Sequence, residues 1–158
     1  QTGFADHVLQ TIARQAYPAN LLELEITETA VFHANRQEIE TLEGLRLHGV
    51  RIALDDFGTG YSTLSNLRQL AVDKIKIDRT FVKSIGQVAD ADAIVRALVQ
   101  LGNNLGVETT AEGVETEEQR QLLRELGCTE LQGFLIARPR PLAEIEPSLH
   151  SEARKLAS

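Results

Sequence analysis

Two adjacent aspartates, Asp55 and Asp56, follow a short apolar run at residues 52–54 and precede a loop that contains Gly58. Adjacent side chains in a regular strand point to opposite faces of the sheet. Where the backbone turns at the end of a strand, both carboxylates can instead reach one cation or two neighbouring cations. Two unpaired anions at the end of a buried strand are costly unless a metal ion neutralises them. The pattern therefore predicts an active centre at these aspartates, with ordinary turn chemistry before Gly58 as the alternative.

Polar residues recur at or near the ends of the other predicted strands. The set is Glu25, Glu28, Asp55, Asp56, Lys76, Asp78, Glu112, Glu115 and Gln132. In a parallel barrel the carboxyl ends of all strands meet at one rim, where active sites lie. Oxygen ligands of this kind suit Mg²⁺ or Mn²⁺ rather than zinc, and two such ions can support an in-line attack on phosphorus. Lys76 would orient a water, help to deprotonate it, or balance the acidic cluster.

Each of these residues has a simpler alternative. Glu25 lies in an alternating strand and could be a solvated outward side chain, and Lys76 could be an ordinary surface lysine. Glu28 and Glu115 have an alternative as carboxylates at helix N-termini. The recurrence of polar groups at successive strand ends favours a shared site over these separate alternatives.

The hydrophobic pattern predicts helices and strands that alternate along the chain. Helices are predicted at residues 4–17, 37–48, 62–70, 90–105, 116–126 and from about 142, and strands at residues 21–26, 52–56, 73–78, 107–111 and 130–136. Such alternation implies a parallel sheet with helices packed outside it, as either a doubly wound fold or a (β/α) barrel. No G-x-G-x-x-G pattern follows a strand, so dinucleotide binding has no support.

Composition excludes several classes of partner. The chain has 158 residues, of which 42% are apolar, enough for one folded domain with a core. Its net charge of −7 disfavours a nucleic-acid polymer as partner. One cysteine, Cys128, rules out an internal disulfide and fits a reducing compartment. Because there is no apolar run near the roughly 18 residues of a membrane span and no signal-peptide pattern, we expect a cytoplasmic chain, or the cytoplasmic part of a larger membrane-bound sensor.

Five segments of the chain resemble the EAL-domain family of cyclic-di-GMP phosphodiesterases. They are residues 24–28 (LEITE), 55–62 (DDFGTGYS), 76–78 (KID), 111–116 (AEGVET) and 132–134 (QGF), in the family's order and with its spacing. The block at 55–62 is highly specific, whereas QGF alone would be weak. The resemblance covers nearly the whole chain and identifies residues 1–158 as the C-terminal portion of an EAL domain.

This resemblance implies a (β/α)8 TIM-barrel-like fold and metal-dependent hydrolysis of cyclic di-GMP to linear pGpG at a two-metal site with Mg²⁺ or Mn²⁺. The implied metal ligands are Glu25, Asp55, Asp56 and Glu112. Lys76 resembles the residue that positions the nucleophilic water. Together with Glu112 and Asp56 it makes up the implied catalytic set.

Other matching residues would surround this centre. Gln132 would lie at the metal and substrate rim, with Asp78 as a second substrate-binding residue. Glu28 would tie down the loop from Phe57 to Ser62, which in the family couples the site to a homodimer interface. Glu115 would also support the site.

In one respect the chain departs from the family pattern. The namesake Glu-Ala-Leu segment and the family's asparagine ligand do not occur in it, and five strands are predicted where a closed barrel has eight. We expect the Glu-Ala-Leu segment and the asparagine ligand to belong to an upstream segment. This chain alone would then be a poor enzyme, or would pair with another copy to cover its open sheet. Two other interpretations stay open. One is a non-catalytic cyclic-di-GMP-binding regulatory module or truncated inactive fragment, and the other is a structural α/β interaction fragment with an accidental acidic rim.

Overall fold

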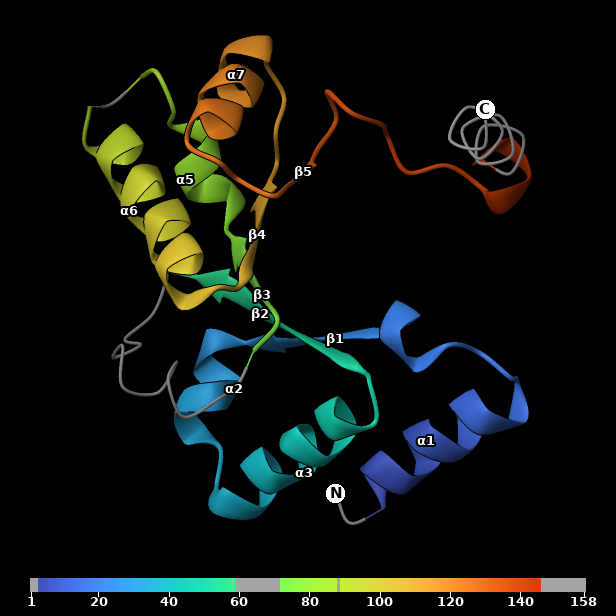
Figure 1. Cartoon of the computed structure of the whole chain (residues 1–158). Helices are drawn as coiled ribbons and strands as arrows, with labels where there is room; N and C mark the ends of the chain where they lie inside the picture. The colour runs from blue at the N-terminus through green and yellow to red at the C-terminus, as the bar shows by residue number, and fades with distance from the viewer. Residues whose placement is uncertain (1–2, 59–71, 88, 146–158) are drawn as a thin grey trace.

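The computed structural model describes residues 3–58, 72–87 and 89–145. Within them, five strands form one sheet in the order β1-β2-β3-β4-β5, and every neighbouring pair is parallel. The strands are β1 (Glu23–Thr27), β2 (Arg51–Phe57), β3 (Lys74–Ile77), β4 (Glu108–Glu112) and β5 (Glu130–Gln132). Spatial order follows chain order, without the reversal that marks a doubly wound sheet. Of the two predicted architectures, the structure therefore has the barrel type, as an incomplete barrel (Figure 1).

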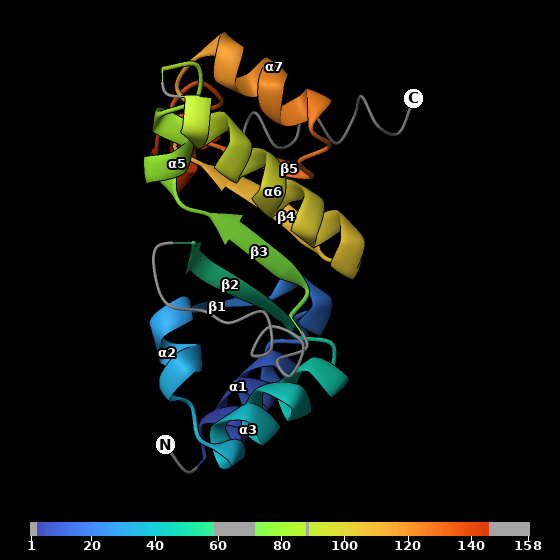
Figure 2. The same cartoon turned by 90° about the vertical axis from the view of Figure 1, so that its left-hand side faces the viewer.

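In the described residues, helices connect β1 to β2, β3 to β4 and β4 to β5. The described helices are α1 (Phe4–Arg14), α2 (Glu28–His33), α3 (Arg36–Leu47), α5 (Arg79–Lys83), α6 (Ala89–Leu105) and α7 (Glu117–Glu125), with a 3₁₀ helix η1 (Ala19–Leu21) before β1. Figure 2 shows the strands crossing the molecule as a twisted ribbon, with α2 and α3 at the β1–β2 end and α6 and α7 at the β4–β5 end. This arrangement confirms the predicted alternation for the connections that the structure describes. Among the described residues, no helix is long and apolar enough to cross a membrane.

Several predicted helices are confirmed and others need correction. Those predicted at 37–48, 90–105 and 116–126 correspond to α3, α6 and α7, and Thr116 closes the expected capping box with Gln119. The first helix ends at Arg14 rather than at residue 17, because Ala16 has a positive φ of 48° that helical geometry does not allow. The pattern does not predict the short helices α2 and α5. The helix predicted at 62–70 lies outside the described residues, and residues 142–145 are helical as predicted.

The last predicted strand, residues 130–136, is wrong beyond Gln132. β5 has only three residues, and the chain bends and turns at residues 133–136. Gly133 lies so close to the backbone of Val114 that a Cβ there would be 2.2 Å from the Val114 carbonyl oxygen. The N–H of Leu135 donates to that same oxygen at 3.0 Å, which folds the apolar residues after Gly133 into a turn instead of a strand.

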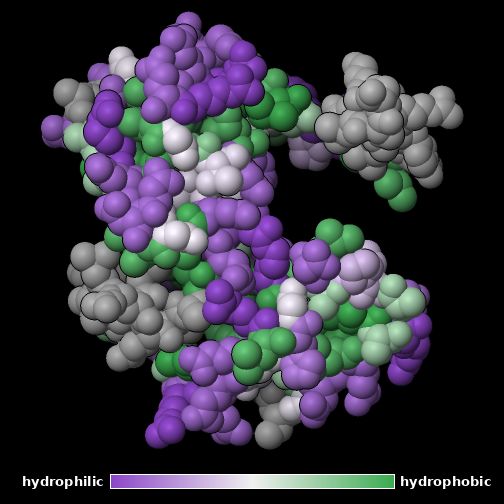
Figure 3. All heavy atoms as spheres, viewed as in Figure 1, coloured by the Kyte–Doolittle hydropathy of each residue, from purple (hydrophilic) through white to green (hydrophobic). Residues whose placement is uncertain are grey.

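Apolar and polar residues alternate along the strands and face opposite sides of the sheet. On β3, Ile75 and Ile77 are completely buried in the apolar core, whereas Lys74 and Lys76 pair with carboxylates on the other, inner face. Figure 3 shows hydrophilic residues where the molecule is hollowed between the two groups of helices. Closed barrels of this type usually fill their interior with branched apolar residues. The charged inner face is therefore the feature of this fold that needs a functional explanation.

The apolar side of β3 should carry a large share of the stability. We expect Ile75→Ala to lower the free energy of unfolding by about 2–5 kcal/mol, because it opens a cavity at a fully buried position. Urea unfolding followed by circular dichroism measures this change. Leu47→Ala is the matched control, since Leu47 is 88% exposed, and it should stay within about 0.5 kcal/mol of the wild type. Equal effects of the two substitutions would contradict the position of the core.

Candidate active site

Three carboxylates from three strands converge on one ammonium group at the inner face. Lys76 Nζ lies 2.7 Å from Glu25 Oε1, 3.0 Å from Asp55 Oδ1 and 2.7 Å from Glu112 Oε1. Lys76 comes from β3, and its three partners come from β1, β2 and β4. Its side chain is only 7% exposed. The structure thus brings together four residues that the sequence pattern selects.

The charges of this cluster do not balance. Burial opposes the charge of Lys76, but its contacts with Glu112, Glu25 and Asp55 outweigh burial, so the pKa of Lys76 lies above its usual value. One cation therefore faces three anions. A cluster with this excess of negative charge is an electrostatic site for added cations.

A β-bulge separates the two aspartates of β2. Leu54 pairs with Ile75 and Phe57 with Ile77, so β2 advances three residues where β3 advances two. At this point Asp56 has a positive φ of 56°, a conformation that Asp tolerates better than most residues. Asp55 lies next to Lys76 and Asp56 is exposed. The backbone therefore turns between the aspartates, and bulges of this kind commonly re-aim a side chain beside an active site.

Glu28 links the start of α2 to the end of β2. Although Glu28 is charged, it is only 3% exposed, and its Oε2 accepts the N–H of Gly58 at 3.0 Å. Gly58 is the last described residue before the segment 59–71. The contact lies at the beginning of the loop that Glu28 is expected to tie down, and the rest of that loop lies outside the described residues.

The structure places the remaining predicted residues at the periphery of the cluster. Gln132 is the register partner of Glu112, so it stands beside the cluster at the end of β5. Asp78 caps α5 by accepting both the N–H and the hydroxyl of Thr80, and these bonds outweigh burial and lower the pKa of Asp78. Glu115 is exposed, and its backbone N–H donates to Gln119 Oε1 at 2.8 Å. Asp78 and Glu115 thus have local structural contacts around helix starts.

Two glycines position the strand ends that carry Glu112 and Gln132. Gly113 has a φ of 69°, and a Cβ there would lie 2.7 Å from the Cβ of Arg79. At Gly133 a Cβ would collide with the backbone of Val114, whose N–H donates to the Gln132 carbonyl at 3.0 Å. Sequence reasoning used both glycines only as parts of motifs. The signal for their role is the recurrence of Gly directly after a polar strand end.

The donor set fits a hard divalent cation. In the described part of the chain, no group of three or more His, Cys, Asp or Glu side chains has the arrangement of a metal site, and Lys76 lies in contact with each of the three carboxylates. Asp55 Oδ1 is nevertheless buried and has no hydrogen bond there, so its 3.0 Å contact with Lys76 is an ion pair rather than a directed hydrogen bond. A buried carboxylate oxygen without a hydrogen-bond donor is costly, and such an oxygen suits Mg²⁺ or Mn²⁺.

Fold and site define a parallel α/β domain of the barrel type with an acidic rim at its strand ends. The family model of the EAL domain matches residues 1–139. The chain belongs to the EAL domain family, as its motifs predict.

Relatives and solved structures agree with this membership. MucR of Pseudomonas aeruginosa, a bifunctional diguanylate cyclase/cyclic di-GMP phosphodiesterase, is 42% identical over 147 residues, covering 93% of this chain and 22% of MucR. The solved MucR phosphodiesterase in its c-di-GMP complex aligns with a TM-score of 0.87 at 41% identity, over 92% of this chain and 59% of that chain. The EAL domain of Mycobacterium smegmatis DcpA aligns with a TM-score of 0.90 at 40% identity, over 96% and 67% of the two chains.

A third solved structure contains a metal. Klebsiella pneumoniae BlrP1, in a manganese and cyclic-di-GMP complex, aligns with a TM-score of 0.79 at 35% identity. The alignment covers 85% of this chain and 34% of BlrP1. The present chain thus spans about a fifth of the length of MucR and part of each solved EAL chain.

The close approach at Gly133 gives a structural prediction. Gly133→Ala should destabilise the protein by about 1–3 kcal/mol, because its Cβ would overlap backbone atoms that cannot move aside as a side chain can. Gly44→Ala is the matched control. Gly44 lies in α3 with nothing within 4 Å of the added Cβ, so alanine there should stabilise by about 0.5–1 kcal/mol. Thermal unfolding of both variants measures the difference, and a stabilising Gly133→Ala would contradict the approach to Val114.

Proposed function

We propose that residues 1–158 are the C-terminal portion of an EAL domain that, when complete, hydrolyses cyclic di-GMP to linear pGpG. Relatives named as cyclic di-GMP phosphodiesterases and the neighbour solved with manganese and cyclic di-GMP support the substrate and the metal. The observation that carries the proposal is the cluster of Glu25, Asp55 and Glu112 around Lys76, with its excess negative charge.

In this proposal the acidic residues hold Mg²⁺ or Mn²⁺. Glu25, Asp55, Asp56 and Glu112 are the ligands from this chain, and Asp55 Oδ1 is a buried oxygen that has an ion pair with Lys76 but no hydrogen bond. The ions would polarise the phosphodiester and supply an activated water. The bulge at Asp56 lets two neighbouring carboxylates serve this one rim.

Lys76 acts as a donor in the proposed mechanism. An ammonium group has three N–H donors and no acceptor, and its three carboxylate neighbours hold Nζ at the centre of the rim. From there it orients the attacking water or a phosphoryl oxygen and stabilises the charge that develops during attack. Gln132, which pairs in register with Glu112, and Asp78 would contact the substrate at the edge of the rim.

The family resemblance also carries proposals about assembly and location. We propose a homodimer through the region from Phe57 to Ser62, as the family resemblance implies. A cytoplasmic location stays a prediction from the sequence.

The metal role can be tested in the full-length protein that contains this domain. Asp55→Asn should lower turnover to pGpG by about 100-fold or more, since it removes the charge of the buried ligand while keeping its shape. Turnover is measured with Mg²⁺ and with Mn²⁺, and cyclic-di-GMP binding is measured in parallel. Asp90→Asn, at an exposed position in α6, is the control and should leave turnover unchanged.

The outcomes of this test separate the candidate functions. Full turnover in Asp55→Asn would rule out its metal role. A wild-type protein that binds cyclic di-GMP without turnover would instead be a regulatory module. One that binds neither cyclic di-GMP nor divalent metal would be an interaction fragment with an accidental acidic rim.

The role of Lys76 predicts a separation of kinetic constants. Lys76→Ala should lower kcat by about 100-fold or more, while KM for cyclic di-GMP changes by only about threefold. The reason is that the lysine acts on the reacting phosphodiester and not on the guanine bases of the substrate. Lys83→Ala, at an exposed position of α5, is the matched control. Steady-state kinetics of both variants check the prediction, and a loss of affinity with kcat intact would contradict it.

A further inference from the structure

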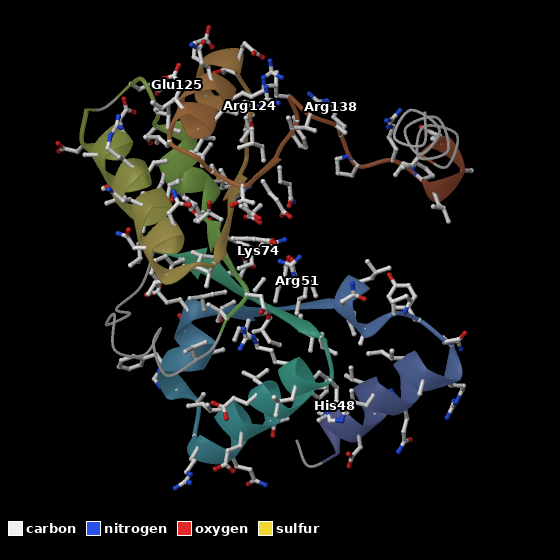
Figure 4. The ribbon with its side chains drawn as sticks, viewed as in Figure 1. His48, Arg51, Lys74, Arg124, Glu125 and Arg138 are labelled. Atoms are coloured by element: carbon white, nitrogen blue, oxygen red, sulfur yellow. The ribbon has the colours of Figure 1, made fainter. Side chains whose placement is uncertain are left out.

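Directly below the candidate active site, the inner face carries a second group of charged residues, which we call the lower charged layer. Its members are Glu23, Arg51, Lys74, Glu108 and Glu130. Lys74 precedes Lys76 by two residues on β3, so both project from the same face, about 7 Å apart along the strand. Figure 4 shows Lys74 and Arg51 close together on the open side of the sheet, between the two groups of helices.

Lys74 joins the two outer strands of the described sheet. Its Nζ lies 3.0 Å from Glu23 Oε2 of β1 and 2.6 Å from Glu130 Oε2 of β5, and its side chain is only 8% exposed. In a flat sheet each of these strands would be two spacings, or about 10 Å, from β3. Side chains that stand roughly perpendicular to a flat sheet could not bring both carboxylates to one nitrogen. The bridge therefore requires the sheet to curl toward its inner face.

Unlike the active-site cluster, the lower charged layer is nearly balanced. Arg51 pairs with Glu108 and lies 3.6 Å from Glu23, and Glu130 also accepts the hydroxyl of Thr110 at 2.9 Å. Two cations thus serve three carboxylates, and each carboxylate has at least two partners among Lys74, Arg51 and Thr110. This network needs no metal, whereas the rim above it has one cation for three carboxylates.

The two layers are connected through the strands. Glu23 precedes Glu25 on β1, Lys74 precedes Lys76 on β3, and Glu130 precedes Gln132 on β5, each by two residues. The bridge fixes the distance between the strands in the lower charged layer. Because the same strands continue to the rim two residues further on, the distance between the strands at the rim is fixed as well.

We propose that Lys74 is a positioning residue for the active site: by bridging Glu23 and Glu130 across the inner face, it sets the curl of the sheet and so the spacing of Glu25, Lys76 and Gln132. The inference rests on the proposed function, because the rim is taken to be the metal and substrate site. Without the ammonium, two carboxylates that share one nitrogen would repel each other and open the sheet just below the rim.

The test compares two neighbouring substitutions on opposite faces of β3 in the full-length protein. Lys74→Met removes the bridge, and Ile75→Ala destabilises the same strand from the apolar side without touching the inner face. Both are measured at a temperature where thermal unfolding shows the variants to be folded. The readouts are Mn²⁺ affinity without substrate, and kcat and KM for cyclic di-GMP.

The expected result is specific to the bridge. Lys74→Met should weaken Mn²⁺ binding and lower kcat by about tenfold each, with a smaller change in KM, because the ligands are misplaced rather than lost. Ile75→Ala should leave Mn²⁺ affinity and kcat within about twofold of the wild type. Lys74→Arg keeps a cation between the two carboxylates and should restore most of the Mn²⁺ affinity.

Each of the other outcomes would overturn either the positioning role of Lys74 or the proposed function. Should Lys74→Met fail to fold, Glu130→Gln replaces it, since it weakens one end of the bridge without leaving an unpaired anion, and it should weaken Mn²⁺ binding by about threefold. Equal Mn²⁺ affinities for the bridge variant, Ile75→Ala and the wild type would overturn the positioning role alone. A wild-type protein with neither Mn²⁺ binding nor turnover would overturn the proposed function, and the positioning role with it.

Discussion

The structure depends on one electrostatic constraint, which is that three carboxylates from three strands share a single buried ammonium. Glu25, Asp55 and Glu112 cannot all approach Lys76 unless β1, β2, β3 and β4 are parallel and end at the same rim. Like charges at such short range repel one another. The cluster therefore depends on the rest of the fold to hold the strands in place, and the apolar core as a whole, rather than any one of its residues, does so.

Because side chains alternate along a strand with a period of two residues, one face of the sheet carries the apolar core and the other carries the charged residues. A shift of register by one residue would exchange the sides of all residues, carrying Lys74 and Lys76 into the apolar core and their isoleucine neighbours to the inner face. Because both exchanges are costly, the sequence specifies the register of β3 strongly although the strand has only four residues. The same period places the lower charged layer directly beneath the rim.

Sequence reasoning found the rim because its chemistry recurs at strand ends. It identified Glu25, Asp55, Lys76 and Glu112 as one set, and it identified the parallel sheet, but it left the choice between barrel and doubly wound fold open until the family resemblance was considered. It missed α2 and α5, which are too short, at six and five residues, to show a helical period. It extended the last strand through residues 134–136, because an apolar run does not reveal the backbone contact made by Gly133. It also passed over Lys74, because a charged residue in an alternating strand gives no sign of the carboxylates from other strands that surround its ammonium group.

A charged interior has to be explained, because well-packed apolar residues of similar volume are often at least as stabilising as buried ion pairs. Stability alone therefore gives no reason for a barrel-type sheet to keep two lysines and several glutamates where branched apolar side chains would pack. A functional reason exists at the rim, where excess negative charge favours added cations. It extends to the lower charged layer, because apolar residues directly under the rim would lower the local dielectric and raise the cost of holding negative charge there. The nearly balanced ion pairs around Lys74 therefore supply the polar surroundings that the acidic rim requires. The two layers form a single electrostatic unit along the inner face of the sheet.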